Sequence, residues 1–188
     1  MTVVLIGPPA AGKTRIGKRV ARLLGVPFVD TDKLIVASHG PIPEIFATHG
    51  EGHFRALERA EVVKALGTDA VVSFGGGAVL DPDTRRDIAE LPVVLLTVQP
   101  HAVESRLGNG KRPLVPDLAS WLALHEKRRE LYESLADHVA DTSDRPTDQI
   151  AAELAEWARG RLSTSTSASP SASASASASP SASRETAS

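Results

Sequence analysis

A phosphate-binding pattern stands near the start of the chain. The pattern G-x-x-x-x-G-K-[ST] is matched in order by Gly7, Pro8, Pro9, Ala10, Ala11, Gly12, Lys13 and Thr14. In such a loop the backbone N–H groups surround nucleotide phosphates, the lysine reaches the β- and γ-phosphates, and the hydroxyl binds Mg²⁺. We therefore predict a nucleotide site in which Lys13 contacts the phosphates and Thr14 is a metal ligand.

Two carboxylates follow the second short apolar run. Asp30 and Asp32 flank Thr31 at the end of that run. One carboxylate could hold the water shell of Mg²⁺, and the other could accept a hydrogen bond or a proton from a substrate hydroxyl. The alternative is that Asp30 or Thr31 only caps the next helix. A pair of acids beside a phosphate loop favours a functional role.

Two arginines could bind a carboxylate. Arg55 and Glu58 are three residues apart on an expected helix, so Glu58 could orient the guanidinium. Arg128 lies in a second charged helix. If both arginines point into one cleft, they form a clamp, because guanidinium binds carboxylate through two parallel hydrogen bonds. Taken singly, each is more simply a solvated surface residue.

Two glycine-rich segments complete the candidate site. Gly75, Gly76 and Gly77 directly follow a strand, which indicates a close approach of backbone to ligand or else a loose turn. The segment from about 108 to 118 contains Gly, Pro and the adjacent cations Lys111 and Arg112. This composition suits a mobile lid that excludes water from a phosphoryl transfer, although an ordinary surface loop has a similar composition.

Alternating strands and helices position these residues. Apolar and β-branched runs predict strands at 2–6, 26–29, 70–74, 93–98 and 138–141. Helical spacing predicts helices up to 24, at 32–39, 42–48, 51–66, 81–91, 100–107 and 117–136, and from Pro146 onward. Such alternation is typical of an α/β fold with a parallel sheet, in which ligands bind at the carboxyl ends of the strands. The candidate residues fall at those ends.

Composition limits the classes of protein that fit. The chain has 188 residues, no cysteine and a net charge of −2, so it offers no basic field for nucleic acid or membrane surfaces. The first apolar run is too short for a signal peptide. We predict one domain over residues 1–162 and a disordered Ser/Ala/Pro-rich tail over 163–188. We expect a cytoplasmic monomer without nucleic acid or membrane partners.

These motifs together resemble shikimate kinase, a small member of the nucleoside monophosphate kinase-like P-loop group. The resemblance covers about residues 2–160 in order. It rests on the phosphate loop, Asp30-Thr31-Asp32, the stretch from Gly50 to Glu58, Gly75–Ala78, Arg112-Pro113-Leu114, and Arg128 with Tyr132. It implies a five-stranded parallel sheet of order 2-3-1-4-5 and ATP-dependent phosphorylation of the shikimate 3-hydroxyl, giving shikimate 3-phosphate and ADP.

The resemblance also implies roles for individual residues. Asp32 would bind shikimate hydroxyls, including the reacting one, and the backbone of Gly75–Gly77 would line the ring site. Arg55, supported by Glu58, and Arg128 would hold the carboxylate. Lys13 and Arg112 would stabilise the phosphates, Thr14 would bind Mg²⁺, and Asp30 would act on the metal through water. The adenine would lie between the segment around Arg106 and the loop at Arg145.

The sequence departs from the family pattern at two places, and two rival functions are open to it. Family members usually have glycine at the position of Ala10, so we expect a slightly reshaped loop. The approach to the lid, Arg106–Asn109, is a residue shorter than in some relatives. A gluconate kinase would share the phosphate loop but lack the two arginines and three glycines. A nucleotide-dependent switch would need Asp-x-x-Gly and Asn-Lys-x-Asp, and neither occurs in this sequence.

Overall fold

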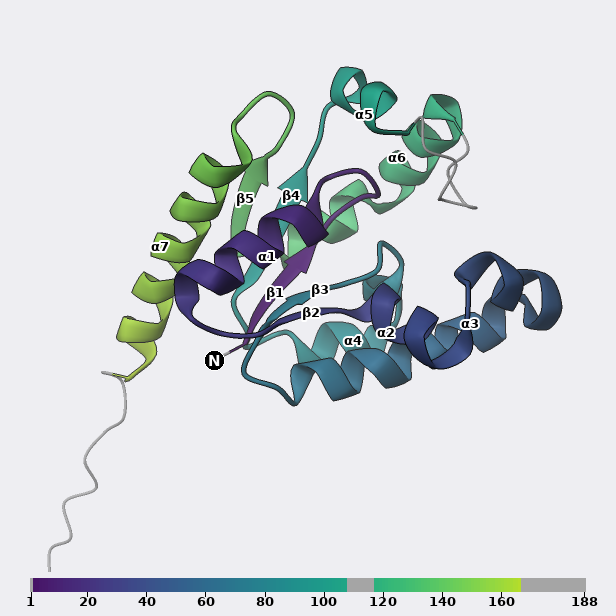
Figure 1. Ribbon diagram of the computed structural model, residues 1–188, viewed down its shortest axis with the longest axis horizontal. Helices are drawn as coiled ribbons and strands as arrows, with labels where there is room; N and C mark the ends of the chain where they lie inside the picture. The colour runs from purple at the N-terminus through teal and green to yellow at the C-terminus, as the bar shows by residue number, and fades with distance from the viewer. Residues whose placement is uncertain (1, 108–116, 167–188) are drawn as a thin grey trace, which may run out of the picture.

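A parallel sheet forms the centre of the protein. The structure, a computed structural model, describes residues 2–107 and 117–166. Within them the strands are β1 (Val3–Ile6), β2 (Phe28–Asp30), β3 (Val71–Ser73), β4 (Val93–Thr97) and β5 (His138–Asp141). All pairings are parallel, and the strand order is β2-β3-β1-β4-β5 (Figure 1). The predicted α/β fold and its strand order are confirmed.

Helices connect the strands and cover the sheet. They are α1 (Lys13–Leu24), α2 (Thr31–His39), α3 (Ile42–Leu66), the 3₁₀ helix η1 (Ala78–Leu80), α4 (Pro82–Asp87), α5 (Pro100–Leu107), α6 (Leu118–Leu135) and α7 (Thr147–Thr166). In Figure 1, α1 and α7 lie together against the sheet, and α3 and α4 lie away from them below β2 and β3. The sheet is therefore sandwiched between two helical layers.

The alternation of side chains along β1 explains these two layers. Val3 and Leu5 belong to the core cluster that contains residues of α1 and α7. Val4 and Ile6 belong to the cluster that contains residues of α3. All four side chains are buried, as expected for a central strand covered on both faces. The strand that carries the phosphate loop is thus held from both sides.

Two predicted boundaries were wrong by two residues or more. The second strand begins at Phe28 instead of residue 26, because Gly25 (φ 71°) caps α1 and the Val26 N–H bonds back to the Ala21 carbonyl at 3.0 Å. Helix α4 ends at Asp87 instead of near residue 91, and short turns follow it. The predicted break between the helices at 42–48 and 51–66 is confirmed, because Gly50, with φ 78° and ψ 174°, interrupts the helical backbone within α3.

The last described element extends past the composition change. Helix α7 continues to Thr166, four residues beyond the predicted boundary at 162. The predicted tail from residue 167 onward lies outside the described residues. Among the described helices, none combines the length and the apolarity needed to cross a membrane.

Candidate active site

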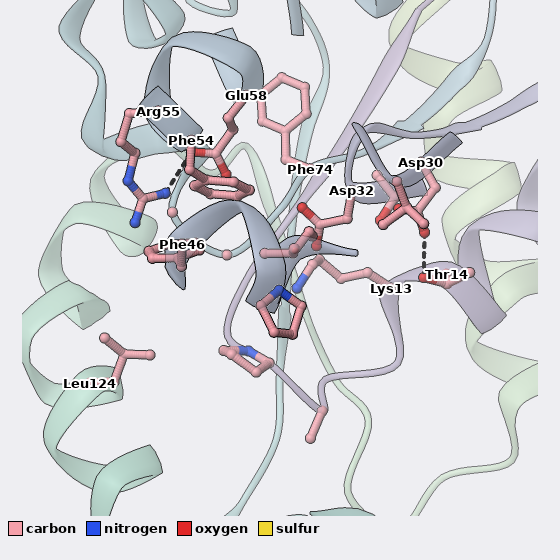
Figure 2. Close-up of a pocket in the computed structure, with 18 of the residues that line it drawn as sticks. Lys13, Thr14, Asp30, Asp32, Phe46, Phe54, Arg55, Glu58, Phe74 and Leu124 are labelled. Atoms are coloured by element: carbon pink, nitrogen blue, oxygen red, sulfur yellow. Dashed lines mark hydrogen bonds and ion pairs between the residues drawn. The ribbon is translucent and has the colours of Figure 1, made fainter. Parts of the chain in front are cut away.

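One cavity collects most of the candidate residues. Its volume is about 540 Å³, and it lies where the loop after β1 meets α2, α3, α6 and the segment after β3. Figure 2 shows the Arg55–Glu58 pair on one side, the Thr14–Asp30 pair on the other, and Lys13 and Asp32 drawn between them. A cavity of this size accommodates a small ligand.

The phosphate loop occupies the turn between β1 and α1. Gly7 has φ 135°, and a Cβ atom there would lie 2.3 Å from the backbone oxygen of Leu96, so only glycine fits against β4. Lys13 Nζ donates to the carbonyl oxygens of Gly7 at 2.7 Å and Pro8 at 3.0 Å. These bonds hold the ammonium group at the loop, next to the N-terminus of α1, where anions bind most readily.

Ala10 adopts the conformation that usually requires glycine. Its φ is 68°, and its side chain is buried. Among the described residues, it is the sole non-glycine residue with positive φ. The left-handed region is unfavourable for an L-residue with a Cβ atom. Ala10 therefore takes up strained backbone geometry, and the surrounding contacts must stabilise it.

Asp30 caps the next helix, as one of the two alternatives predicted, and also contacts the first turn of α1. One carboxylate oxygen accepts the Thr14 hydroxyl hydrogen bond at 2.6 Å. The other accepts from the Lys33 N–H at 3.3 Å and caps α2. Mg²⁺ in kinase sites takes one or two protein oxygens besides phosphates and waters, so the adjacent hydroxyl and carboxylate suit this ion. No cluster of three acidic or histidine ligands exists among residues 2–107 and 117–166.

Asp32 lies against the first of the three glycines. A Cβ atom on Gly75 would lie 2.3 Å from Asp32 Oδ1 and 2.8 Å from Glu58 Oε1. The Gly75 N–H donates to the buried Thr31 hydroxyl at 3.0 Å, which ties this segment to the start of α2. Glycine is needed here because two carboxylates pack directly on the backbone.

Arg55 is held by acidic residues of its own helix. It donates to Glu58 at 2.6 Å and to Glu51 at 3.0 Å. Glu58 is buried, and burial raises the pKa of its carboxyl group, while the Arg55 guanidinium opposes the rise. The i,i+3 orientation of Arg55 by Glu58 is thus present in the structure. A Cβ atom on Gly77 would lie 2.1 Å from Arg55, so the guanidinium rests on this glycine.

Arg128 reaches the same three-glycine segment from α6. Its guanidinium donates to the Gly76 carbonyl oxygen at 2.9 Å, and the Tyr132 hydroxyl donates to the same oxygen at 2.5 Å. Both side chains are buried. Arg55 and Arg128 both line the cavity, which places two cations beside Asp32. The structure therefore brings the two arginines together, and their binding of a substrate stays a prediction.

The remaining predicted residues are those of the lid and of the expected adenine site. Of the lid predicted at about 108–118, residues 108–116, with Lys111 and Arg112, fall outside the described residues, and Leu118 is the first residue of α6. Arg145 does not line the cavity and forms an ion pair with Glu153 of α7. Arg106 bonds to the carbonyl oxygens of Thr142 at 2.7 Å and Ser143 at 3.1 Å. Its guanidinium thus ties α5 to the loop after β5.

Sequence reasoning missed the apolar wall of the cavity. The Phe46 and Phe54 rings lie 4.6 Å apart between centroids, and Leu124 of α6 also lines the space. The kink at Gly50, with φ 78°, separates the two halves of α3 and brings these rings together. The sequence signal that could have revealed this wall was the pair Phe46 and Phe54 on either side of Gly50 and Gly52. Such a wall suits one face of a carbon ring.

Comparisons with known proteins point in one direction. The sequence pattern of the family described as shikimate kinase matches residues 9–159. The shikimate kinase of Salinispora tropica is 48% identical over 158 residues, covering 81% of this chain and 94% of that protein. The structure of shikimate kinase from Acinetobacter baumannii in complex with shikimate superposes with a TM-score of 0.78 at 28% identity, covering 89% of this chain and 95% of that one.

A rival enzyme shares only the fold. A gluconokinase from Sinorhizobium meliloti superposes with a TM-score of 0.58 at 21% identity, covering 88% of this chain and 95% of that one. At that identity the likeness shows the architecture alone. This likeness therefore carries no information about the substrate of this chain.

Proposed function

This chain belongs to the shikimate kinase family, and from that premise we propose how the residues of its cavity divide the work. The reaction is the ATP-dependent phosphorylation of the 3-hydroxyl of shikimate, which gives shikimate 3-phosphate and ADP and serves aromatic amino acid biosynthesis. The observation that carries the assignment is that the phosphate loop, Asp32, Arg55 and Arg128 line one and the same cavity. Those groups match a small acid that carries hydroxyls.

The two arginines and the aromatic wall bind the acceptor. Arg55 and Arg128 hold the carboxylate of shikimate, and their fixed contacts with Glu58 and Gly76 keep both guanidinium groups in place. The ring of the substrate packs between the three-glycine segment and Phe54. Positioning of this kind dominates phosphoryl transfer, because the loose transition state needs little covalent assistance from the protein.

Asp32 binds the reacting hydroxyl and accepts its proton. It accepts the hydrogen bond of the 3-hydroxyl and orients the oxygen toward the γ-phosphorus of ATP. As the new oxygen–phosphorus bond forms, the bond from that phosphorus to the bridging oxygen of ADP breaks, and the hydroxyl proton passes to Asp32. Lys13, held at the loop, stabilises the charge on the phosphoryl oxygens, and we assign the same role to Arg112 by family resemblance.

Thr14 and Asp30 are the residues that would hold Mg²⁺. Their 2.6 Å hydrogen bond places a hydroxyl and a carboxylate together at the start of α1, and this donor set fits an ion that also binds phosphate oxygens and water. When bound, Mg²⁺ neutralises charge on the nucleotide phosphates. We propose Thr14 as a direct ligand and Asp30 as a ligand through water.

Among the described residues, the enzyme needs no second chain to complete its acceptor site. We propose that it works in the cytoplasm as a monomer, since one chain supplies every described residue assigned to the acceptor. The net charge of −2 offers no general attraction for nucleic acid.

Replacing the carboxylate of shikimate by an ester tests whether the acceptor site binds an acid and not a neutral polyol. Methyl shikimate keeps the hydroxyls but loses the negative charge that Arg55 and Arg128 bind. We expect its kcat/KM to fall by about two orders of magnitude, because a hydrogen bond to a charged group contributes about 1.5–3 kcal/mol. Coupled ADP release measures both rates. Equal kcat/KM for acid and ester would contradict the two-arginine clamp.

A further inference from the structure

The carbonyl groups of the phosphate loop are held from outside the sequence motif. Lys13 Nζ donates hydrogen bonds to the first two carbonyl oxygens of the loop, those of Gly7 and Pro8. The next three accept hydrogen bonds from other parts of the fold: Trp121 Nε1 to Pro9 at 2.8 Å, Arg106 to Ala10 at 3.1 Å and Thr142 Oγ1 to Ala11 at 3.0 Å. Three elements that no phosphate-loop pattern includes thus fix the outer side of the loop.

The bond from Trp121 determines where the next N–H points. The peptide unit between Pro9 and Ala10 is planar and trans, so its C=O and N–H groups point in opposite directions. Because the Pro9 carbonyl points at the indole, the Ala10 N–H points away from it. Ala10 lines the cavity and Trp121 does not. The indole therefore directs one loop donor toward the phosphate side.

The same bond supports the strained residue. Ala10 has φ 68°, which an alanine adopts only when its surroundings impose it. The peptide unit before Ala10 is held by Trp121, and the unit after it is held by Arg106. The peptide units on both sides of Ala10, which stands where shikimate kinases usually have glycine, are thus each held by a hydrogen bond.

Trp121 is well placed to be a rigid support. Its side chain is 1% exposed, and its ring stacks on His125 with centroids 4.8 Å apart and planes 23° apart. Its helix, α6, is capped one turn earlier by Asp117, which accepts from the Ser120 N–H at 2.7 Å. Figure 1 shows the loop after β1 extending toward α6. If the indole turned away, its hydrogen bond to the Pro9 carbonyl and its stacking on His125 would both be lost.

We infer that Trp121 is a positioning residue for nucleotide binding, acting through the Pro9 carbonyl on the left-handed Ala10. This inference rests on the proposed function, because it assumes that the loop binds nucleotide phosphates. It assigns the role to one hydrogen bond, so loss of the indole N–H weakens nucleotide binding and leaves the acceptor site unaffected.

The test replaces each of the two tryptophans of the chain in turn. Trp121→Phe keeps an aromatic ring beside His125 and removes the N–H donor. Trp157→Phe is the matched control, because Trp157 lies on the far helix α7 and packs against His138 of β5. Calorimetry with ADP as the probe is expected to show about tenfold weaker binding for Trp121→Phe, the effect of one lost hydrogen bond, and wild-type binding for the control. Shikimate KM is expected to stay unchanged in both.

A second variant tests the connection to Ala10. Glycine adopts positive φ freely, so Ala10→Gly in the Trp121→Phe background is expected to recover several-fold of the lost ADP affinity. Recovery shows that the indole acts through this residue, since groups coupled in this way deviate from additivity. A purely additive result would overturn the proposed route.

Fluorescence provides a readout that does not require Trp121→Phe to fold. In the Trp157→Phe protein, emission comes from Trp121 alone and is expected to change when ADP binds. No change on saturation with ADP would overturn the inference, as would equal ADP affinity of wild type and Trp121→Phe, or an equal loss of ADP and shikimate affinity. If ADP does not bind the unaltered protein, the proposed function itself fails.

Discussion

Several side chains of this site hold two partners at once. Asp30 caps α2 with one oxygen and holds Thr14 with the other. Glu58 pairs with Arg55 while it packs against Gly75. A residue with two partners has little freedom to turn, so the cavity is formed by groups whose positions are already set. Such preorganisation is what phosphoryl transfer requires of a protein.

At Arg128, a change of shape without a change of charge should weaken acceptor binding. Arg128→Lys keeps the cation but loses the planar group that donates to Gly76 and can still bind a carboxylate. We expect shikimate KM to rise about 10- to 100-fold, as for a lost hydrogen bond to a charged group. ATP KM should not change. Steady-state kinetics that showed a raised ATP KM and a normal shikimate KM would reverse the assignment.

A single methyl group at Gly77 should displace Arg55. The added Cβ would lie 2.1 Å from one guanidinium nitrogen and 2.7 Å from its carbon, so the side chain must move. Gly77→Ala is expected to raise shikimate KM at least tenfold, by loss of the hydrogen bonds of Arg55. Gly160→Ala is the control, because a Cβ there meets nothing within 4 Å. Unchanged kinetics for Gly77→Ala would remove Arg55 from the acceptor site.

At the scale of elements, local patterns predicted the strands and helices but not how helices bend or join. Apolar periodicity located all five described strands, since burial repeats along the chain. The break at Gly50 was predicted, but the angle between the two halves of α3 was not, because that angle depends on what the halves pack against. The meeting of Phe46 and Phe54 follows from that angle. The apolar wall was missed for the same reason.

The close packing of α1 on the sheet makes a prediction at Gly17. A Cβ there would lie 2.4 Å from the Phe28 ring and 2.8 Å from Leu5. Overpacking of this kind costs about 1–3 kcal/mol, so we expect Gly17→Ala to lower Tm by about 2–12 °C. Gly160→Ala, also on a helix, gains only helix propensity and should not lower Tm. A Tm equal to or above wild type for Gly17→Ala would contradict the packing.

At the scale of the whole molecule, the sheet brings together residues that are far apart in sequence. Asp32, Arg55 and Arg128 come from α2, α3 and α6, and they meet because those elements lie at one end of parallel strands. The sequence allowed this meeting to be predicted from topology and family resemblance. It did not reveal the support of the loop by Trp121, because that contact joins residues 112 positions apart.

The Ser/Ala-rich end should be dispensable for catalysis. Residues 167–188 contain no large apolar side chain, so they have little to bury against the domain. We expect a protein that ends at Thr166, the last residue of α7, to match the full chain in kcat, both KM values and Tm. Kinetics and thermal melts of the two proteins, measured side by side, check this. A clear loss in either would show that the tail packs on the domain.

Acceptor specificity tests the account as a whole. ADP release is measured at saturating ATP and Mg²⁺ with shikimate, quinate, gluconate or water as the acceptor. The cavity formed by Asp32, Arg55 and Arg128 predicts a high rate with shikimate, lower rates with quinate and gluconate, and only background hydrolysis with water. A rate with shikimate no greater than the water background, or a preference for gluconate, would contradict the central claim.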